Sequence, residues 1–108
     1  MYERKGNEII TEAIDIMGDN ISFVVTDDGM LSDNSYTYGE AFMNGVDDRW
    51  NEKIISDIII TYGCKLCDKH ITRKIFGENI EGAIMSMIQA VTALEEYLYS
   101  LPKEEEDK

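Results

Sequence analysis

The chemistry-bearing residues closest together in the sequence are two cysteines and the single histidine, at Cys64, Cys67 and His70. The Cys-x₂-Cys spacing and the histidine offer three of the four ligands that a structural zinc site needs. Asp68, water or a second subunit would have to complete such a site. Redox activity of the pair is a second interpretation, although no strand is predicted before it as in thioredoxin-like units. The sequence favours a third, in which both cysteines are buried apolar residues on a helix over 64–76. We therefore predict neither metal nor cofactor.

Other groups suited to catalysis are few. His70 could act as a base toward Cys67, but no orienting group or oxyanion hole is evident in the sequence. Asp27-Asp28-Gly29 followed by Asp33 resembles a cation-binding loop, but its spacing does not fit the calcium pattern, so a turn is predicted. There is also no glycine-rich phosphate loop and no nucleophile elbow. We predict that the protein is not an enzyme.

Carboxylates are far more abundant than any other ionisable group. The 108 residues hold 22 Asp and Glu against 10 Lys and Arg, giving a net charge of −12. No Lys or Arg occurs between Gly6 and Asp48, so this segment cannot neutralise itself and a negative field must survive folding. The ten acids of the segment are the candidate partner-binding residues: Glu8, Glu12, Asp15, Asp19, Asp27, Asp28, Asp33, Glu40, Asp47 and Asp48. This charge disfavours direct nucleic-acid binding.

Two interpretations of the acidity remain open. In the first, the charge serves solubility alone, because acidic surfaces keep small proteins dispersed. Alternatively, it complements a basic protein surface, steers the encounter and excludes wrong partners, with the carboxylates placed like DNA phosphates. Residues 63–76 differ from the rest, with four bases and one acid. This basic segment could dock on the acidic region or contact an acidic rim of a partner.

In size and charge the whole chain resembles the small acidic DNA-mimic and anti-defence inhibitors that phages and mobile elements encode. The resemblance is one of composition, because that class shares no motif. It implies a non-enzymatic inhibitor or modulator, often dimeric, of a basic nucleic-acid-handling protein such as a restriction or CRISPR complex. Tyr36, Tyr38 and Phe42 would be its aromatic anchors if they are exposed. The alternative is a structural or regulatory subunit that binds through its last helix.

The elements that position these residues are predicted to form an α+β fold: an N-terminal helix, a small antiparallel sheet of two or three strands, and a helical C-terminal half. Apolar residues at helical spacing predict the first helix over 7–17. The β-branched run 21–26 enters Asp27-Asp28-Gly29 and predicts a hairpin that returns through 30–31, with a third strand over 36–43.

The C-terminal half is predicted to contain helices that begin near Asp47 or Asp48 and end at Gly63, then 64–76, then a long helix over 79–101. Apolar residues of the last helix alternate at spacings of four and three, and only three charges lie along it. It is therefore either the central helix of the fold or, in part, a homodimer interface over residues 80–101.

The length fits one domain, expected over 1–101, with an acidic disordered tail over 102–108. No apolar run is long enough for a transmembrane helix, and the first residues do not resemble a signal peptide. We expect a cytoplasmic protein with no membrane partner.

Overall fold

The computed structural model describes residues 2–100. Along the chain, its elements are β1 (Tyr2–Lys5), β2 (Glu8–Ile14), β3 (Asn20–Val25), β4 (Met30–Ser32), α1 (Tyr36–Met43), the 3-10 helix η1 (Asp47–Arg49), α2 (Glu52–Ile60), β5 (Lys65–Cys67), β6 (His70–Lys74) and α3 (Ile80–Tyr99). The predicted fold class is wrong, because the chain begins with strands and builds a sheet of six. The tail predicted over 102–108 lies outside the described residues.

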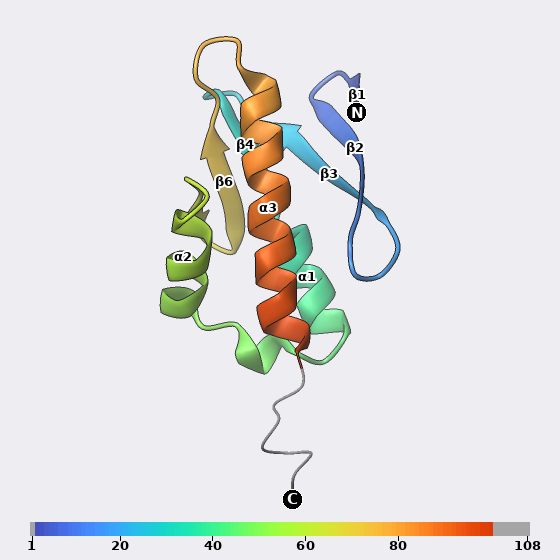
Figure 1. The fold of residues 1–108 in the computed structure, drawn as a ribbon, viewed down its shortest axis with the longest axis vertical. Helices are drawn as coiled ribbons and strands as arrows, with labels where there is room; N and C mark the ends of the chain where they lie inside the picture. Colours follow the sequence, from blue (N-terminus) through green and yellow to red (C-terminus); the bar gives the residue numbers. More distant parts are fainter. Residues whose placement is uncertain (1, 101–108) are drawn as a thin grey trace, which may run out of the picture.

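The sheet is antiparallel throughout, with strand order β1-β2-β3-β4-β6-β5 (Figure 1). The segment that contains α1, η1 and α2 is inserted between β4 and the β5–β6 hairpin. Strand pairing places one row of residues across all six strands: Lys5, Glu8, Val24, Ser32, Thr72 and Lys65. Because side chains alternate along a strand, these residues share one face of the sheet.

The helix predicted over 7–17 is wrong, because this segment forms β2 as part of the β1–β2 hairpin. A two-residue turn, Gly6-Asn7, joins the strands, and Gly6 has the positive φ of 61° that tight hairpin turns require. The apolar spacing was ambiguous because Ile9 and Ile10 lie on opposite faces of one strand. Of the two, only Ile9 is fully buried.

The helix predicted over 64–76 is also wrong, because these residues form the β5–β6 hairpin. Its turn residues, Asp68 and Lys69, have φ values of 50° and 70°. Two successive positive φ angles define the type I′ hairpin turn, which usually contains Asn-Gly. The sequence places no glycine there, so the usual signal for this hairpin is missing.

The strand predicted over 36–43 is wrong as well, because these residues form helix α1. The carboxylate of Asp33 accepts hydrogen bonds from the Ser35 and Thr37 backbone N–H groups at 3.0 and 3.2 Å, which satisfies donors at the start of the helix. Thr37 and Ala41, one turn apart, are the buried residues of α1.

The predictions for the remaining elements agree better with the structure. Strand β3 and its turn into β4 lie where they were predicted. The helix expected before Gly63 is present as η1 and α2, but α2 is capped by Asn51 and not by Asp47 or Asp48. Asn51 Oδ1 accepts hydrogen bonds from the backbone N–H groups of Lys53 and Ile54 at 3.0 and 3.1 Å.

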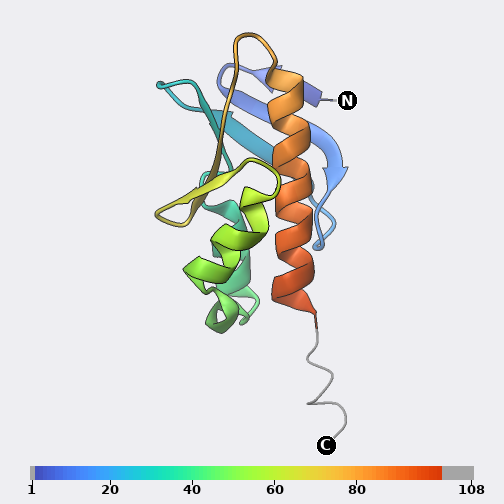
Figure 2. The ribbon, with the colours of Figure 1, turned by 60° about the vertical axis from the view of Figure 1, so that its left-hand side comes forward.

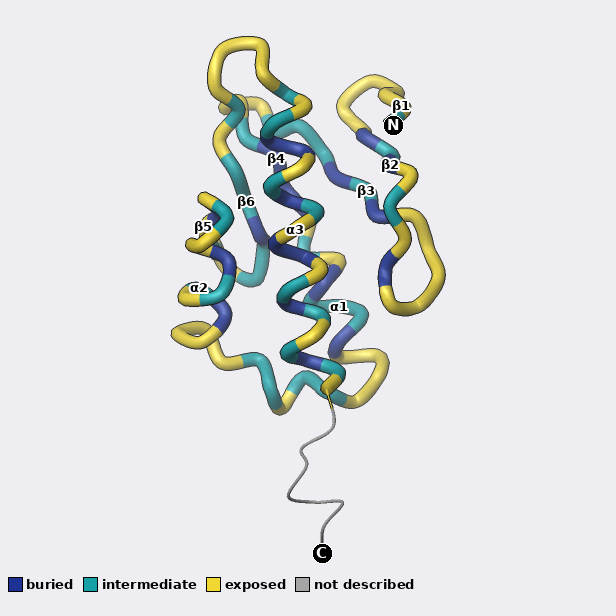
Figure 3. Tube along the Cα trace, viewed as in Figure 1, coloured by how far each residue is buried: buried dark blue, intermediate teal, exposed yellow. Residues whose placement is uncertain are grey.

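Helix α3 crosses one face of the sheet, with α2 beside it (Figures 1 and 2). Its predicted apolar seam is confirmed as core, since Ile84, Met87, Val91, Leu94 and Leu98 are all buried. The outward side of α3 is exposed, as are the turn between β2 and β3 and the end of α1 (Figure 3). Within residues 2–100, no helix combines the length and apolar character needed to cross a membrane.

Candidate functional site

The two cysteines of the Cys-x₂-Cys motif lie in different environments. Cys64 is fully buried, with its Sγ 3.8 Å from Met87 Sδ, whereas Cys67 is exposed at the end of β5. The prediction that both are buried is therefore wrong for Cys67. Burial raises the pKa of Cys64 to about 11, with the nearby Arg73 opposing the shift, so its thiol stays protonated near neutral pH. Across residues 2–100, no three His, Cys, Asp or Glu side chains are placed to hold a metal ion.

Cys67 and His70 border a groove of about 390 Å³ on the sheet face that carries Ser32 and Thr72. His70 Nδ1 lies 3.4 Å from Ser32 Oγ. Ser32 is buried, however, and its hydroxyl accepts a hydrogen bond from the Asn34 backbone N–H at 3.0 Å. This hydroxyl is held by the fold and cannot serve as an exposed nucleophile.

Two of the ten candidate acids, Asp15 and Asp33, are only 7% and 3% exposed. Asp33 accepts hydrogen bonds from Ser35, Thr37 and, at 2.9 Å, from the Ile71 backbone N–H of β6. Burial raises the pKa of Asp33, and these hydrogen bonds oppose the increase. Its carboxylate joins α1 to β6 and is not available to a partner.

Asp15 organises the connection between β2 and β3. Its Oδ1 accepts hydrogen bonds from the backbone N–H groups of Met17 and Asp19, both at 2.9 Å. These contacts close the loop and leave the side chains of Ile16 and Met17 exposed.

The loop after β2, helix α1 and the last turns of α3 together form a cluster that we call the acidic end, defined by Asp15, Asp19, Glu40 and Glu95. Glu95 Oε1 accepts a hydrogen bond from the Ile16 backbone N–H at 3.1 Å. Burial, with added repulsion from Asp15 and Glu40, raises the pKa of Glu95 to about 7. Three of these four carboxylates come from the segment between Gly6 and Asp48, which contains no base, and Glu95 joins them from α3.

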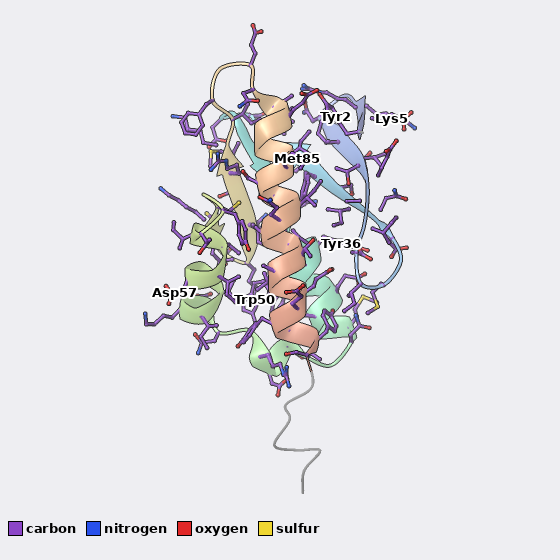
Figure 4. All side chains as sticks on the ribbon, in the orientation of Figure 1. Tyr2, Lys5, Tyr36, Trp50, Asp57 and Met85 are labelled. Carbon is purple, nitrogen blue, oxygen red and sulfur yellow. The ribbon has the colours of Figure 1, made fainter. Side chains whose placement is uncertain are left out.

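Two tyrosines at the acidic end, Tyr36 and Tyr99, have raised pKa values. The hydrogen bond with Glu40 is the largest cause that raises the pKa of Tyr36, and burial raises that of Tyr99. The Tyr36 hydroxyl donates to Asp19 Oδ2 at 3.4 Å. Figure 4 shows Tyr36 on the side of α3 that faces the β2–β3 loop. Clustered shifts of this kind are a feature of functional sites.

Apolar side chains adjoin these carboxylates. Ile16, Met17 and Met43 are exposed, and Met43 is the most exposed large apolar residue of the described chain, at 83%. Asn44 Nδ2 lies 3.6 Å from Met17 Sδ and donates to the Tyr99 hydroxyl at 3.1 Å, which connects α1, the loop and α3. The acidic end therefore combines exposed apolar side chains with negative charge.

Sequence reasoning missed Glu95, because this residue lies outside the base-free segment. The available signal was that Glu95 is one of only three charged residues along the predicted helix over 79–101. Of the other predicted acids, Glu8 and Glu12 lie on β2, Asp27 and Asp28 in the β3–β4 turn, and Asp47 and Asp48 in η1. The ten acids thus do not form one continuous row.

The proposed aromatic anchors differ in exposure. Tyr36 and Phe42 are exposed. Tyr38 is half-buried, because it packs edge-on against Trp50 with ring centroids 5.0 Å apart and lies 5.1 Å below Lys69 Nζ. Tyr36 and Phe42 thus remain available as anchors.

Comparison of the chain with protein-family models, curated proteins and solved structures found no match.

Proposed function

We propose that the protein is a non-enzymatic binding protein that uses its acidic end to dock on a basic surface of a nucleic-acid-handling protein and so inhibits or modulates it. The observation that carries the proposal is the convergence of Asp15, Asp19, Glu40 and Glu95 beside exposed apolar side chains. Solubility requires charge to be spread over the surface, and it gives no reason to gather carboxylates around Glu95, whose pKa is raised to about 7 by burial and, to a lesser extent, by repulsion from Asp15 and Glu40.

Complementary charge would steer the encounter, and the exposed Ile16, Met17 and Met43 would supply the apolar contact. A lysine or arginine of the partner would relieve the repulsion among the carboxylates. If the partner's surface normally holds DNA, the acidic end occupies that site as a mimic of phosphate charge.

The experiment is capture of partners from a lysate of the source cells with two variants of equal net charge. One neutralises the acidic end through Asp19→Asn and Glu40→Gln, and the other neutralises two exposed acids elsewhere through Glu52→Gln and Glu78→Gln. We expect the wild type and the second variant to retain a nucleic-acid-binding protein that duplex DNA displaces, and the first variant to lose it. Equal retention by both variants would overturn the proposal.

A second candidate function is a subunit that binds through α3. Its outward face carries the exposed, uncharged Met85, Gln89 and Thr92, with the exposed Glu81 and Glu96 at the two ends of this row. A groove of about 270 Å³ runs beside this face and is lined in part by Tyr62, Ile88 and Glu96. The affinity for a partner bound there through apolar contacts would depend little on salt, and the Asp19 and Glu40 substitutions would leave it unchanged.

A further inference from the structure

The basic segment predicted from the sequence forms a surface of its own. Its four bases, Lys65, Lys69, Arg73 and Lys74, lie on or between β5 and β6, at the sheet edge opposite β1 and β2. Outside residues 63–76 the chain holds 21 acids and 6 bases, so this edge is a local reversal of sign.

A groove of about 340 Å³ lies among these bases. Met30, Gly63 and Thr72 contribute to its lining, with Lys65, Arg73, Lys74 and Phe76, and none of the carboxylates within residues 2–100 does. Phe76 is 60% exposed, so the groove offers an aromatic ring together with three cationic side chains.

Two of the three cationic groups, those of Arg73 and Lys74, have contacts that hold them near the groove before any ligand arrives. Arg73 Nη1 donates to the Gly63 carbonyl at 2.9 Å, and a Cβ at Gly63 would lie only 1.8 Å from that nitrogen. The Arg73 guanidinium and Lys74 Nζ lie 5.8 and 5.7 Å from the centre of the Phe76 ring. Such preorganisation lowers the entropy lost when a ligand binds.

Protection of a sheet edge accounts for only part of this arrangement. Lysine on an edge strand discourages pairing with another chain, and this explains Lys65 on β5. Arg73 and Lys74 pair with Leu31 and Met30 of β4, but β5 pairs with β6 only over residues 70–72, so these two residues also lie along an open edge. Edge protection explains their charge, but it does not explain why the aromatic ring of Phe76 lies exposed beside them.

We propose that this groove, between Lys65, Arg73, Lys74 and Phe76, is a docking site for a short acidic protein segment that carries an apolar side chain. Its carboxylates would meet the three cations, and its apolar side chain would pack on Phe76. A long polyanion such as nucleic acid fits less well, because the rest of the molecule repels it. This site is separate from the acidic end.

The test uses the labelled acidic peptide Ac-DEFDELDE as probe and measures its fluorescence anisotropy with the full chain. The site variant is Lys74→Glu with Phe76→Ser, and Arg73 is left intact because it packs on Gly63. The control is Lys53→Glu with Met85→Ser, which makes the same changes on the exposed surfaces of α2 and α3. We expect at least tenfold weaker binding for the site variant and at most a threefold change for the control.

Equal weakening in both variants would overturn the proposal, because the effect would then be one of net charge. Binding of a single-stranded oligonucleotide in preference to the peptide would overturn it too. So would self-association that Lys74→Glu abolishes in a protein that does not bind the peptide, because the occupant would then be a second copy. Circular dichroism checks that each variant folds. The Asp19→Asn, Glu40→Gln variant should keep peptide binding, so failure here and failure of the proposed function are distinguishable.

Discussion

At the scale of single residues, carboxylates of this chain have different roles. Asp33 accepts three backbone hydrogen bonds and holds α1 to β6. Asp15 accepts two that close the β2–β3 loop, and Glu95 accepts one while it lies against Asp15 and Glu40. Composition predicts the excess of charge, but it cannot say which oxygen accepts a backbone N–H. Sequence spacing is equally limited for Cys64 and Cys67. It suggests that the two thiols act together, but Cys64 lies in the core and Cys67 on the surface.

Glu95 makes stability dependent on pH. Its pKa is raised from 4.5 to about 7 in the folded protein, so the folded state binds the proton more tightly than the unfolded state does. The free energy of unfolding should therefore fall as pH rises from about 4.5 through 7. Glu95→Gln keeps the acceptor for Ile16 and should flatten this part of the profile of melting temperature against pH. The control, Glu96→Gln at an exposed position, should leave the profile as in the wild type. A Glu95→Gln profile as steep as that of the wild type would show that Glu95 is not the group responsible.

Asp33 should be the carboxylate that matters most for folding. Asp33→Ala leaves three backbone N–H groups without their acceptor, and an unsatisfied buried donor costs about 1–3 kcal/mol. We expect a loss of about 3 kcal/mol in the free energy of unfolding, measured by urea denaturation. Asp33→Asn should lose less because it retains one acceptor oxygen. Exposed Asp27→Ala should change stability by less than about 0.5 kcal/mol, and a similar loss in both alanine variants would contradict this role.

At the scale of elements, sequence reasoning worked where one local signal was unambiguous. The run 21–26 before Asp27-Asp28-Gly29 and the long seam of α3 were both predicted. The N-terminal hairpin was missed because residues at helical spacing also fit a strand with two partly apolar faces, and Asn7, the first residue of the predicted helix, forms the hairpin turn with Gly6. Helix α1 depends on Asp33, whose third hydrogen bond is to a strand 38 residues away, and no local pattern shows that contact.

The β5–β6 turn gives a test at this scale. Lys69 has φ of 70°, which glycine adopts with less strain than lysine does. Lys69→Gly should raise the free energy of unfolding by about 0.5–1 kcal/mol, as measured by urea denaturation. Lys69→Ala removes the contact with Tyr38 without relieving the backbone, so it should not stabilise. Stabilisation by alanine equal to that by glycine would show that φ is not the cause.

At the scale of the whole molecule, with its net charge of −12, three surfaces differ in charge. They are the acidic end, the basic edge at β5–β6, and the outer face of α3, where uncharged residues lie between Glu81 and Glu96. The sequence predicted the negative charge of the first surface and the positive charge of the second. It could not predict that Glu95 joins Asp15, Asp19 and Glu40, because the sheet and α3 bring distant segments together.

Homodimerisation through α3 remains a prediction for this third surface. Most of its apolar seam is buried in the protomer, and Tyr97 donates to the Arg49 carbonyl at 2.8 Å. Only the outward face around Met85 and Gln89 is left for a second copy. Light scattering should give a dimer for the wild type that Gln89→Arg converts to a monomer, while Thr61→Arg, at an exposed position outside this face, leaves it dimeric. A wild-type monomer at high concentration would contradict the prediction.

The measurement that tests the central claim most directly is the affinity of the wild-type protein for its captured partner as a function of NaCl concentration. Exposed charge pairs are screened as the Debye length falls from about 10 Å at 0.1 M salt to about 3 Å at 1 M. Docking through the acidic end predicts binding that weakens about tenfold or more over this range. It also predicts a shallower dependence for the Asp19→Asn, Glu40→Gln variant. An affinity that salt leaves unchanged would contradict the claim and would favour the uncharged residues Met85, Gln89 and Thr92 of α3 as the binding surface.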